Sequence, residues 1–135
     1  MWIPYEIKHK HSEDFIVKYR LYKVEEGGRK QTFQGYRCDF AYDGDDISKT
    51  GIYMIHPEFE DEKGNVIKDE NEPVNLSGTA RMWIAFPKMR EEIHKHRIKI
   101  GTKGYFMEGS RRIGETEVIK VVGLDTNGII MKIDK

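Results

Sequence analysis

Two glycine-containing turns hold the residues of this sequence that are best suited to bind an anion. The first turn reads Glu25-Glu26-Gly27-Gly28-Arg29-Lys30, and the second reads Glu108-Gly109-Ser110-Arg111-Arg112. Arginine supplies forked hydrogen-bond donors, and a glycine turn exposes backbone N–H groups, so each turn has the chemistry to bind phosphate. The alternative is an ordinary β-turn whose arginines keep the surface soluble, and one turn alone does not decide between the two.

The sequence lacks the residue patterns of the common catalytic sites. Its nearest match to a nucleotide-binding loop, Gly44 to Thr50, has no glycine before the lysine and places two carboxylates where phosphate would lie. No Gly-x-Ser-x-Gly motif occurs, and Cys38 falls inside a predicted strand, where a small buried thiol is expected. We therefore expect no enzyme, no nucleotide and no cofactor.

Two pairs of histidines, His9 with His11 and His94 with His96, have the spacing of residues on one face of a strand. A zinc site needs three or four ligands, and no clear third ligand accompanies either pair. Solvated histidines without a metal are therefore expected. An enzyme that uses these pairs to hold a metal is the less favoured alternative.

Acidic and basic residues are unevenly distributed, although the 135-residue chain has a formal net charge of zero. Residues 39–72 contain eleven acidic residues against three lysines, and residues 81–112 contain nine basic residues against three glutamates. The two segments either neutralise each other across the folded domain or form opposed patches that steer a partner. Without net charge, a general affinity for polyanions is not expected.

Cysteine content and hydropathy predict a cytoplasmic protein. Cys38 is the only cysteine, which excludes an internal disulfide and fits a reducing compartment. The first residues lack an apolar core of signal-peptide length, and no apolar run reaches the roughly 18 residues of a membrane span. We expect a single domain over residues 1–135, with no membrane segment.

Alternating apolar residues predict strands along most of the chain. The first runs from Phe15 to Leu21, and the Gly27-Gly28 turn is predicted to close a hairpin with a strand over 33–42. Further strands are predicted near 52–55, 80–86, 98–100, 104–107, 112–122 and 129–133, with a small hairpin around Val66 and a short helix that begins at Pro87. This pattern predicts an all-β, antiparallel barrel or sandwich.

The order of several motifs resembles the C-terminal (third) domain of translation elongation factor Tu. Glu25-Glu26-Gly27-Gly28-Arg29 is followed by Gly35-Tyr36-Arg37, then by Phe40 and Tyr42, and finally by Glu108 to Gly114. The segment from Val74 to Met82 is similar to one in which the family carries Pro-Gly-Asp. The resemblance covers about residues 13–124, with additions near 56–71 and 88–101, and implies a stand-alone version of that domain.

The resemblance implies a six-stranded antiparallel Greek-key barrel with an extra loop or hairpin and one short helix. In the family, this barrel helps to hold the T arm of aminoacyl-tRNA and packs against a GTPase domain, for which these residues have no counterpart. Cys38 stands where the family has proline, and Ser110 replaces the second glycine of the late turn. Positions on the T-arm side match Glu108, Gly109, Arg29 and Lys30; Arg111 matches the arginine of the motif, and Arg112 is added on the ground of its charge.

Two functions are expected from this resemblance. The first is a non-enzymatic binding module related to translation, which contacts tRNA through Arg29, Lys30, Glu108, Gly109, Arg111 and Arg112. The second is a protein-interaction module, acting as a partner, decoy or regulator that presents an elongation-factor-like surface to a translation-factor protein without binding RNA. In that case, the acidic segment from Glu58 to Glu72 is expected to make the specific contact.

Overall fold

The central strand of the fold follows directly from the alternation of its sequence. Strand β1 (Phe15–Leu21) buries its odd-numbered residues and exposes Lys18 and Arg20. It pairs antiparallel with β4 (Ser77–Ile84) on one side and with β6 (Arg111–Val121) on the other. The computed structural model describes residues 1–127, so the strand predicted at 129–133 lies outside the described residues.

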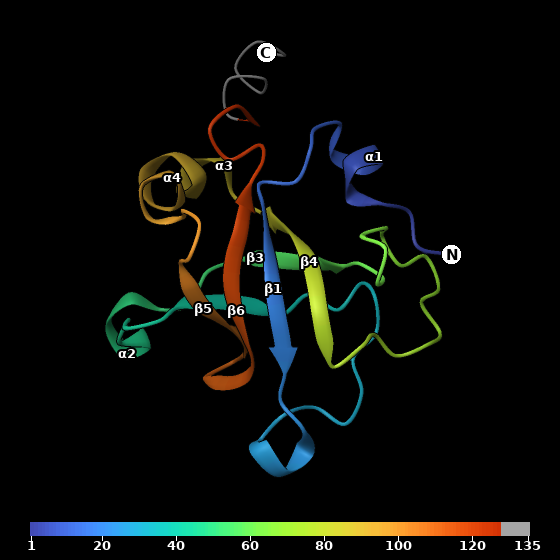
Figure 1. The fold of residues 1–135 in the computed structure, drawn as a ribbon. Coiled ribbons are helices and arrows are strands. Elements are labelled where there is room, and N and C mark those ends of the chain that lie inside the picture. The colour runs from blue at the N-terminus through green and yellow to red at the C-terminus, as the bar shows by residue number, and fades with distance from the viewer. Residues whose placement is uncertain (128–135) are drawn as a thin grey trace.

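The other strands extend this pair of contacts into a curled sheet. They are β2 (Asp39–Tyr42), β3 (Ile55–Phe59) and β5 (Lys103–Glu108). Within the described part of the chain, the sheet has six strands in the order β2-β5-β6-β1-β4-β3, and each neighbouring pair is antiparallel. Figure 1 shows β6, β1 and β4 in front of β2 and β3. The prediction of a mostly antiparallel, all-β fold is confirmed.

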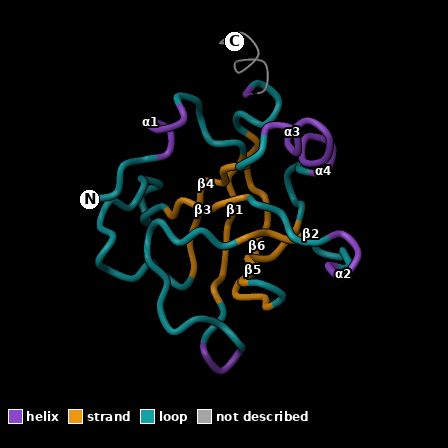
Figure 2. The backbone as a smooth tube through the Cα atoms, turned by 180° about the vertical axis from the view of Figure 1, so that it is seen from behind, coloured by secondary structure: helices purple, strands orange, loops and turns teal. Residues whose placement is uncertain are grey.

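In the described part of the chain, the two edges of the sheet meet at a backbone pair and through the side chains of Gln34 and His56, whose Nδ1 lies 3.2 Å from the Cys38 carbonyl. Phe40 in β2 and Tyr53 exchange two backbone hydrogen bonds, each 2.8 Å long. Beyond this pair, the side-chain amide of Gln34 binds backbone groups that a neighbouring strand would otherwise bind. It donates to the carbonyls of Phe59 (2.9 Å) and Ile67 (2.8 Å) and accepts from the Phe59 N–H (2.8 Å). Figure 2 shows β2 and β3 from this closing side.

Short helices occupy the connections between strands. In the described residues they are α1 (Tyr5–His9), the 3-10 turn η1 (Val24–Glu26), α2 (Ile47–Thr50), and a continuous segment made of α3 (Pro87–Met89), the π-helical turn η2 (Arg90–His94) and α4 (Lys95–Arg97). The last segment confirms the helix predicted from Pro87. Neither α1 nor α2 was predicted, because five and four residues are too few to show helical periodicity.

A buried ion pair fastens the helical segment to the curled, barrel-like sheet, which we call the barrel. Arg90 donates through Nε to Asp14 Oδ1 at 2.7 Å, and the two side chains are 1% and 0% exposed. Asp14 also accepts from the backbone N–H of Ile84 (2.8 Å) and from the Asn127 amide (2.9 Å). A buried charge is stable only with such complete pairing, so this network fixes where the helix lies.

The core is apolar and lies inside the curled sheet. Each fully buried large side chain contributes roughly 1.5–3 kcal/mol relative to an exposed one. The principal core residues from the six strands are Phe15, Val17, Phe40, Ile55, Phe59, Ala80, Met82, Phe106, Ile113 and Val118. Among the described residues, no helix is both long and apolar enough to cross a membrane.

Several of the predicted elements differ from the structure, and the strand predicted over 33–42 is shortened to Asp39–Tyr42. The Gly27-Gly28 turn does not close a β1–β2 hairpin, since β1 lies between β4 and β6. Regular structure continues through β3 to Phe59, where acidic residues and a proline had obscured the strand. Residues 98–100 form no strand; the alternating isoleucines there lie between α4 and β5. The small hairpin around Val66 is present as an isolated bridge between Glu60 and Val66.

Candidate functional site

The two glycine turns identified in the sequence lie at the same end of the barrel, opposite the helical segment 87–97 (Figure 1). Gly27 has a φ of +94° and ends η1, and Gly109 has a φ of +59° between β5 and β6. Gly28 is required for a different reason, because a Cβ at this position would lie 1.9 Å from the carbonyl oxygen of Tyr22. These glycines therefore allow the turns that place Arg29 and Arg111 at this end of the barrel.

The arginines of the two turns meet on one carboxylate. Arg29 and Tyr36 both donate to Oε2 of Glu108, and Arg111 donates to Oε1 of the same side chain. The Arg29 guanidinium also lies 3.8 Å from the centre of the Tyr36 ring, within the range of a cation–π contact. We call Arg29, Tyr36, Glu108 and Arg111 the turn cluster.

The electrostatics of the turn cluster favour a charged Glu108. The hydrogen bond from Tyr36 and then those from Arg29 and Arg111 lower the pKa of Glu108, while burial raises the pKa of Tyr36 to about 12, assisted by its bond to Glu108. The side chains of Arg29 and Arg111 remain 30% and 50% exposed. The cluster is thus pre-arranged and still open to solvent on its outer side.

The remaining predicted site residues flank the turn cluster. Lys30 is exposed and follows Arg29, and Gly109 is exposed beside Glu108. Arg112 points along the sheet, with its guanidinium 3.9 Å from the ring centre of Tyr105. The six predicted residues therefore gather at one end of the barrel, with four cations and one carboxylate among them. Tyr36 was not predicted as a site residue, although the Gly35-Tyr36-Arg37 motif contains it.

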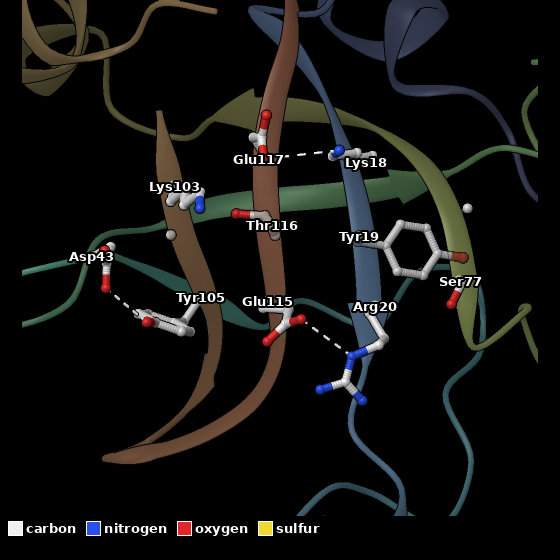
Figure 3. A pocket seen from close by; sticks show the side chains of 12 residues that line it. Lys18, Tyr19, Arg20, Asp43, Ser77, Lys103, Tyr105, Glu115, Thr116 and Glu117 are labelled. Atoms are coloured by element: carbon white, nitrogen blue, oxygen red, sulfur yellow. Dashed lines mark hydrogen bonds and ion pairs between the residues drawn. The ribbon is translucent and has the colours of Figure 1, made fainter. Parts of the chain in front are cut away.

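A shallow groove adjoins Arg112 on the outer face of β4, β1, β6 and β5 and encloses about 620 Å³ (Figure 3). Its charges pair across neighbouring strands: Lys18 with Glu117 at 3.8 Å and Arg20 with Glu115 at 3.1 Å. At the β5 side, Tyr105 donates to Asp43 at 2.7 Å (Figure 3). Since these charges compensate one another, the groove has no strong preference for an anion or a cation.

Neither histidine pair lies on a strand, and the expectation of solvated histidines is wrong for His94, which is buried. His9 ends α1 and stacks on His11 with ring centres 5.7 Å apart, whereas His94 is buried in η2 and His96 is exposed in α4. Burial lowers the pKa of His94 to about 4. No group of three or more metal-ligating side chains is found within residues 1–127. Cys38 is buried as predicted, and burial raises the pKa of its thiol.

The acidic segment from Glu58 to Glu72 divides into a buried part and an exposed part. Glu58 is fully buried, and Glu60 is 6% exposed because it accepts hydrogen bonds from Thr79 (2.7 Å) and Arg81 (2.8 Å). The expectation that the whole segment faces a partner is therefore wrong for these two residues. The acids that remain exposed are Glu62, Asp69, Glu70 and Glu72.

Ion pairs connect the acidic and basic stretches of the sequence. Arg97 binds Asp45 through two hydrogen bonds of 3.0 Å, and Arg81 binds Glu60. These contacts favour mutual neutralisation for part of the charge.

Comparison with known proteins adds no constraint, because no family model and no curated protein matches the chain.

Proposed function

We propose that this protein is a non-enzymatic binding module that contacts RNA of the translation machinery through the turn cluster and its flanking cations, Lys30 and Arg112. The observation that carries the proposal is the convergence of Arg29 and Arg111 on Glu108, which lies 79 residues after Arg29 in the sequence. Two remote turns that share one carboxylate form a defined surface, as phosphate recognition requires.

Glu108 orients the arginines without consuming their hydrogen-bonding capacity. Arg29 uses Nη1 for Glu108 and Nε for the Gln31 carbonyl, and Arg111 uses Nη2 for Glu108. A guanidinium carries five N–H donors, so several remain for phosphate oxygens. The two turns together carry Arg29, Lys30, Arg111 and Arg112 against Glu25, Glu26 and Glu108, and Glu26 is paired with Arg20, so this end of the barrel keeps a small positive excess although the whole chain is neutral.

A closer assignment within this proposal is kinship with the C-terminal barrel of elongation factor Tu. The strand order supports a Greek-key connection, because β1 and β2 are consecutive in the chain but are not neighbours in the sheet. The meeting of the Glu-Gly-Gly-Arg turn with the late Glu108-Gly109 turn also supports it, since both motifs were matched to that family from the sequence. Under this assignment the RNA is tRNA.

Filter binding of labelled tRNA at two salt concentrations tests the proposed function. Replacing Arg111 and Arg112 together by alanine is expected to weaken binding by about 1–3 kcal/mol and to flatten its salt dependence. Lys88→Ala is the control, because Lys88 is exposed in α3, and α3 lies at the opposite end of the barrel (Figure 1). If the unmodified protein fails to retain tRNA at low salt, the proposal must be abandoned.

A second candidate function is a protein-interaction module that binds a translation-factor protein without RNA. It is favoured by Glu108, because a surface presenting paired opposite charges suits a protein partner better than it suits a polyanion. Affinity capture with and without nuclease separates the two functions. Capture of the same partner protein after nuclease treatment supports the protein-interaction module. If the double variant Glu70→Lys with Glu72→Lys no longer captures that partner, the contact lies on the exposed acidic residues.

A further inference from the structure

Residues 1–11, which we call the arm, lie outside the core and rest on the outer face of β3 and β4. Figures 1 and 2 show α1 and the chain start beside β4. Trp2, Tyr5 and Trp83 form a separate apolar cluster there, with Val66 packed against it. Because Trp83 belongs to β4, this cluster packs the arm against the barrel.

The arm is held by a single buried carboxylate. Oε2 of Glu58 accepts from the indole N–H of Trp2 at 2.8 Å and from the backbone N–H of Tyr5 at 2.7 Å. The other oxygen, Oε1, accepts from the indole N–H of Trp83 at 3.2 Å. Glu58 is 0% exposed, so each of these bonds compensates the desolvation of a buried charge.

The barrel provides a shaped cavity for the indole ring of Trp2. Gly35 borders it, and a Cβ there would lie 2.9 Å from Cζ3 of the ring. The backbone N–H of Trp2 donates to the carbonyl of Lys68 at 2.8 Å. Gly35, Glu58 and Lys68 all lie far from the arm in sequence, so other elements build the Trp2 pocket, which includes a buried acceptor for an indole N–H.

The connection between the arm and the barrel has the character of a hinge. Lys10, which follows α1, has a φ of +60° and is the residue other than glycine with a positive φ among residues 1–127. A left-handed conformation costs a residue with a side chain roughly 1–2 kcal/mol. Lys10 is the C-cap of α1, and four residues further on Asp14 is fixed in the buried network with Arg90, so a hinge for the arm would have to lie between α1 and Asp14.

We propose that the Trp2 pocket accepts the arm of a second copy of this chain, so that two protomers exchange arms. The hinge at Lys10 would open, its left-handed conformation would be released, and every contact of Trp2 with Glu58, Gly35 and Lys68 would re-form between chains. Such reciprocal exchange gives a closed two-fold dimer. Ile3 and Ile7 of the arm, 54% and 66% exposed, supply apolar surface for the new interface. The proposal is independent of RNA binding.

Complementation between two full-length variants tests the exchange. Trp2→Ala keeps the pocket and loses the anchor, whereas Glu58→Leu keeps the anchor and loses the carboxylate. Each variant alone is expected to be monomeric by light scattering after gel filtration, and their equimolar mixture is expected to form a heterodimer. The unmodified protein is expected to show a dimer fraction that rises with concentration. A mixture that stays monomeric at millimolar concentration would overturn the proposal.

A peptide measurement keeps the test decisive if Trp2→Ala does not fold. In that case Trp2→Phe, which retains a ring but has no N–H, replaces it. A labelled synthetic peptide of residues 1–11 is expected to bind whichever Trp2 variant folds, and to do so at least about tenfold more tightly than the same peptide carrying alanine in place of Trp2. Equal binding of the two peptides contradicts recognition of the indole by the pocket and overturns the exchange.

Discussion

Acid should destabilise this protein through His94, a residue that joins the helical segment 87–97 to the barrel. Nδ1 of His94 lies 2.6 Å from the hydroxyl of Tyr42 in β2, and the His94 side chain is 1% exposed. Burial, together with the charges of Arg97 and Arg90, lowers its pKa from 6.5 to about 4, although Asp14 acts in the opposite direction. The folded state therefore holds His94 neutral at pH values where the unfolded chain binds a proton.

The size of the effect follows from this difference in proton binding. Because the folded-state pKa is the lower one, the stabilisation is complete above pH 6.5 and is lost as the pH falls from about 6.5 to about 4. A difference of two to three pKa units corresponds to about 3 kcal/mol over that whole range, and to about 2 kcal/mol between pH 7 and pH 5. Below about pH 4 the folded state also binds the proton, and the loss levels off.

Urea unfolding at pH 7 and pH 5 isolates the contribution of His94. His94→Gln should destabilise the protein at pH 7, and this destabilisation should shrink by about 2 kcal/mol at pH 5, since glutamine does not titrate. His96→Gln is the matched control, because His96 lies two residues away in the same helical segment and is exposed. If the difference between wild type and His94→Gln is the same at both pH values, the argument from burial is refuted.

Three further substitutions test the contacts that hold the fold. Asp14→Ala should lower the free energy of unfolding, measured in urea, by about 3–5 kcal/mol, because Arg90 stays buried without the Asp14 carboxylate. The double variant Asp14→Leu with Arg90→Met should lose less stability than Asp14→Ala. Equal losses in the two variants would contradict this. Gln34→Leu should lower the free energy of unfolding by about 2–4 kcal/mol, because the Gln34 amide joins the two edges of the sheet. Gln31→Leu, at an exposed position, should change it by no more than about 0.5 kcal/mol. Similar values for the two variants would contradict a role of the Gln34 amide in closing the sheet. Gly104→Ala should lower the free energy of unfolding by about 1–3 kcal/mol, since the Cβ of the alanine would lie 2.3 Å from the Phe40 ring. An unchanged midpoint of urea unfolding would show that the Phe40 ring moves freely.

Strands were predictable where one face of the sheet is buried and the other is solvated. β1 shows this directly, and β4 buries Ala80, Met82 and Ile84 on the predicted face. The pairing of strands was not predictable in the same way, because alternation reports which side chains are buried but not which strand lies alongside. The Gly27-Gly28 turn illustrates the difference: it reverses the chain locally, yet it leads away from β1 instead of back along it.

The polar interior escaped prediction for a physical reason. Charged residues such as Glu58, Glu60 and Arg90 are ordinarily exposed, and they become stable inside a protein only when partners remote in sequence complete their hydrogen bonds. The convergence of Arg29 and Arg111 on the Glu108 carboxylate likewise required the folded geometry, because the two turns are remote in sequence. Tyr36, named from the sequence only within the Gly35-Tyr36-Arg37 motif, also belongs to this cluster.

These buried polar contacts restrict how the function of each segment can be examined. The segment 88–101, predicted as an addition, holds Arg90 and His94, and the acidic segment contains Glu60, which binds Arg81. Deleting either segment would strand a buried charge or donor in the remaining barrel, so any loss of binding would follow from unfolding rather than from a missing contact. Substitutions confined to exposed side chains avoid this. Charge reversal at Glu70 or Glu72, and alanine at Arg111 or Arg112, can therefore distinguish a protein partner from RNA, whereas truncation cannot.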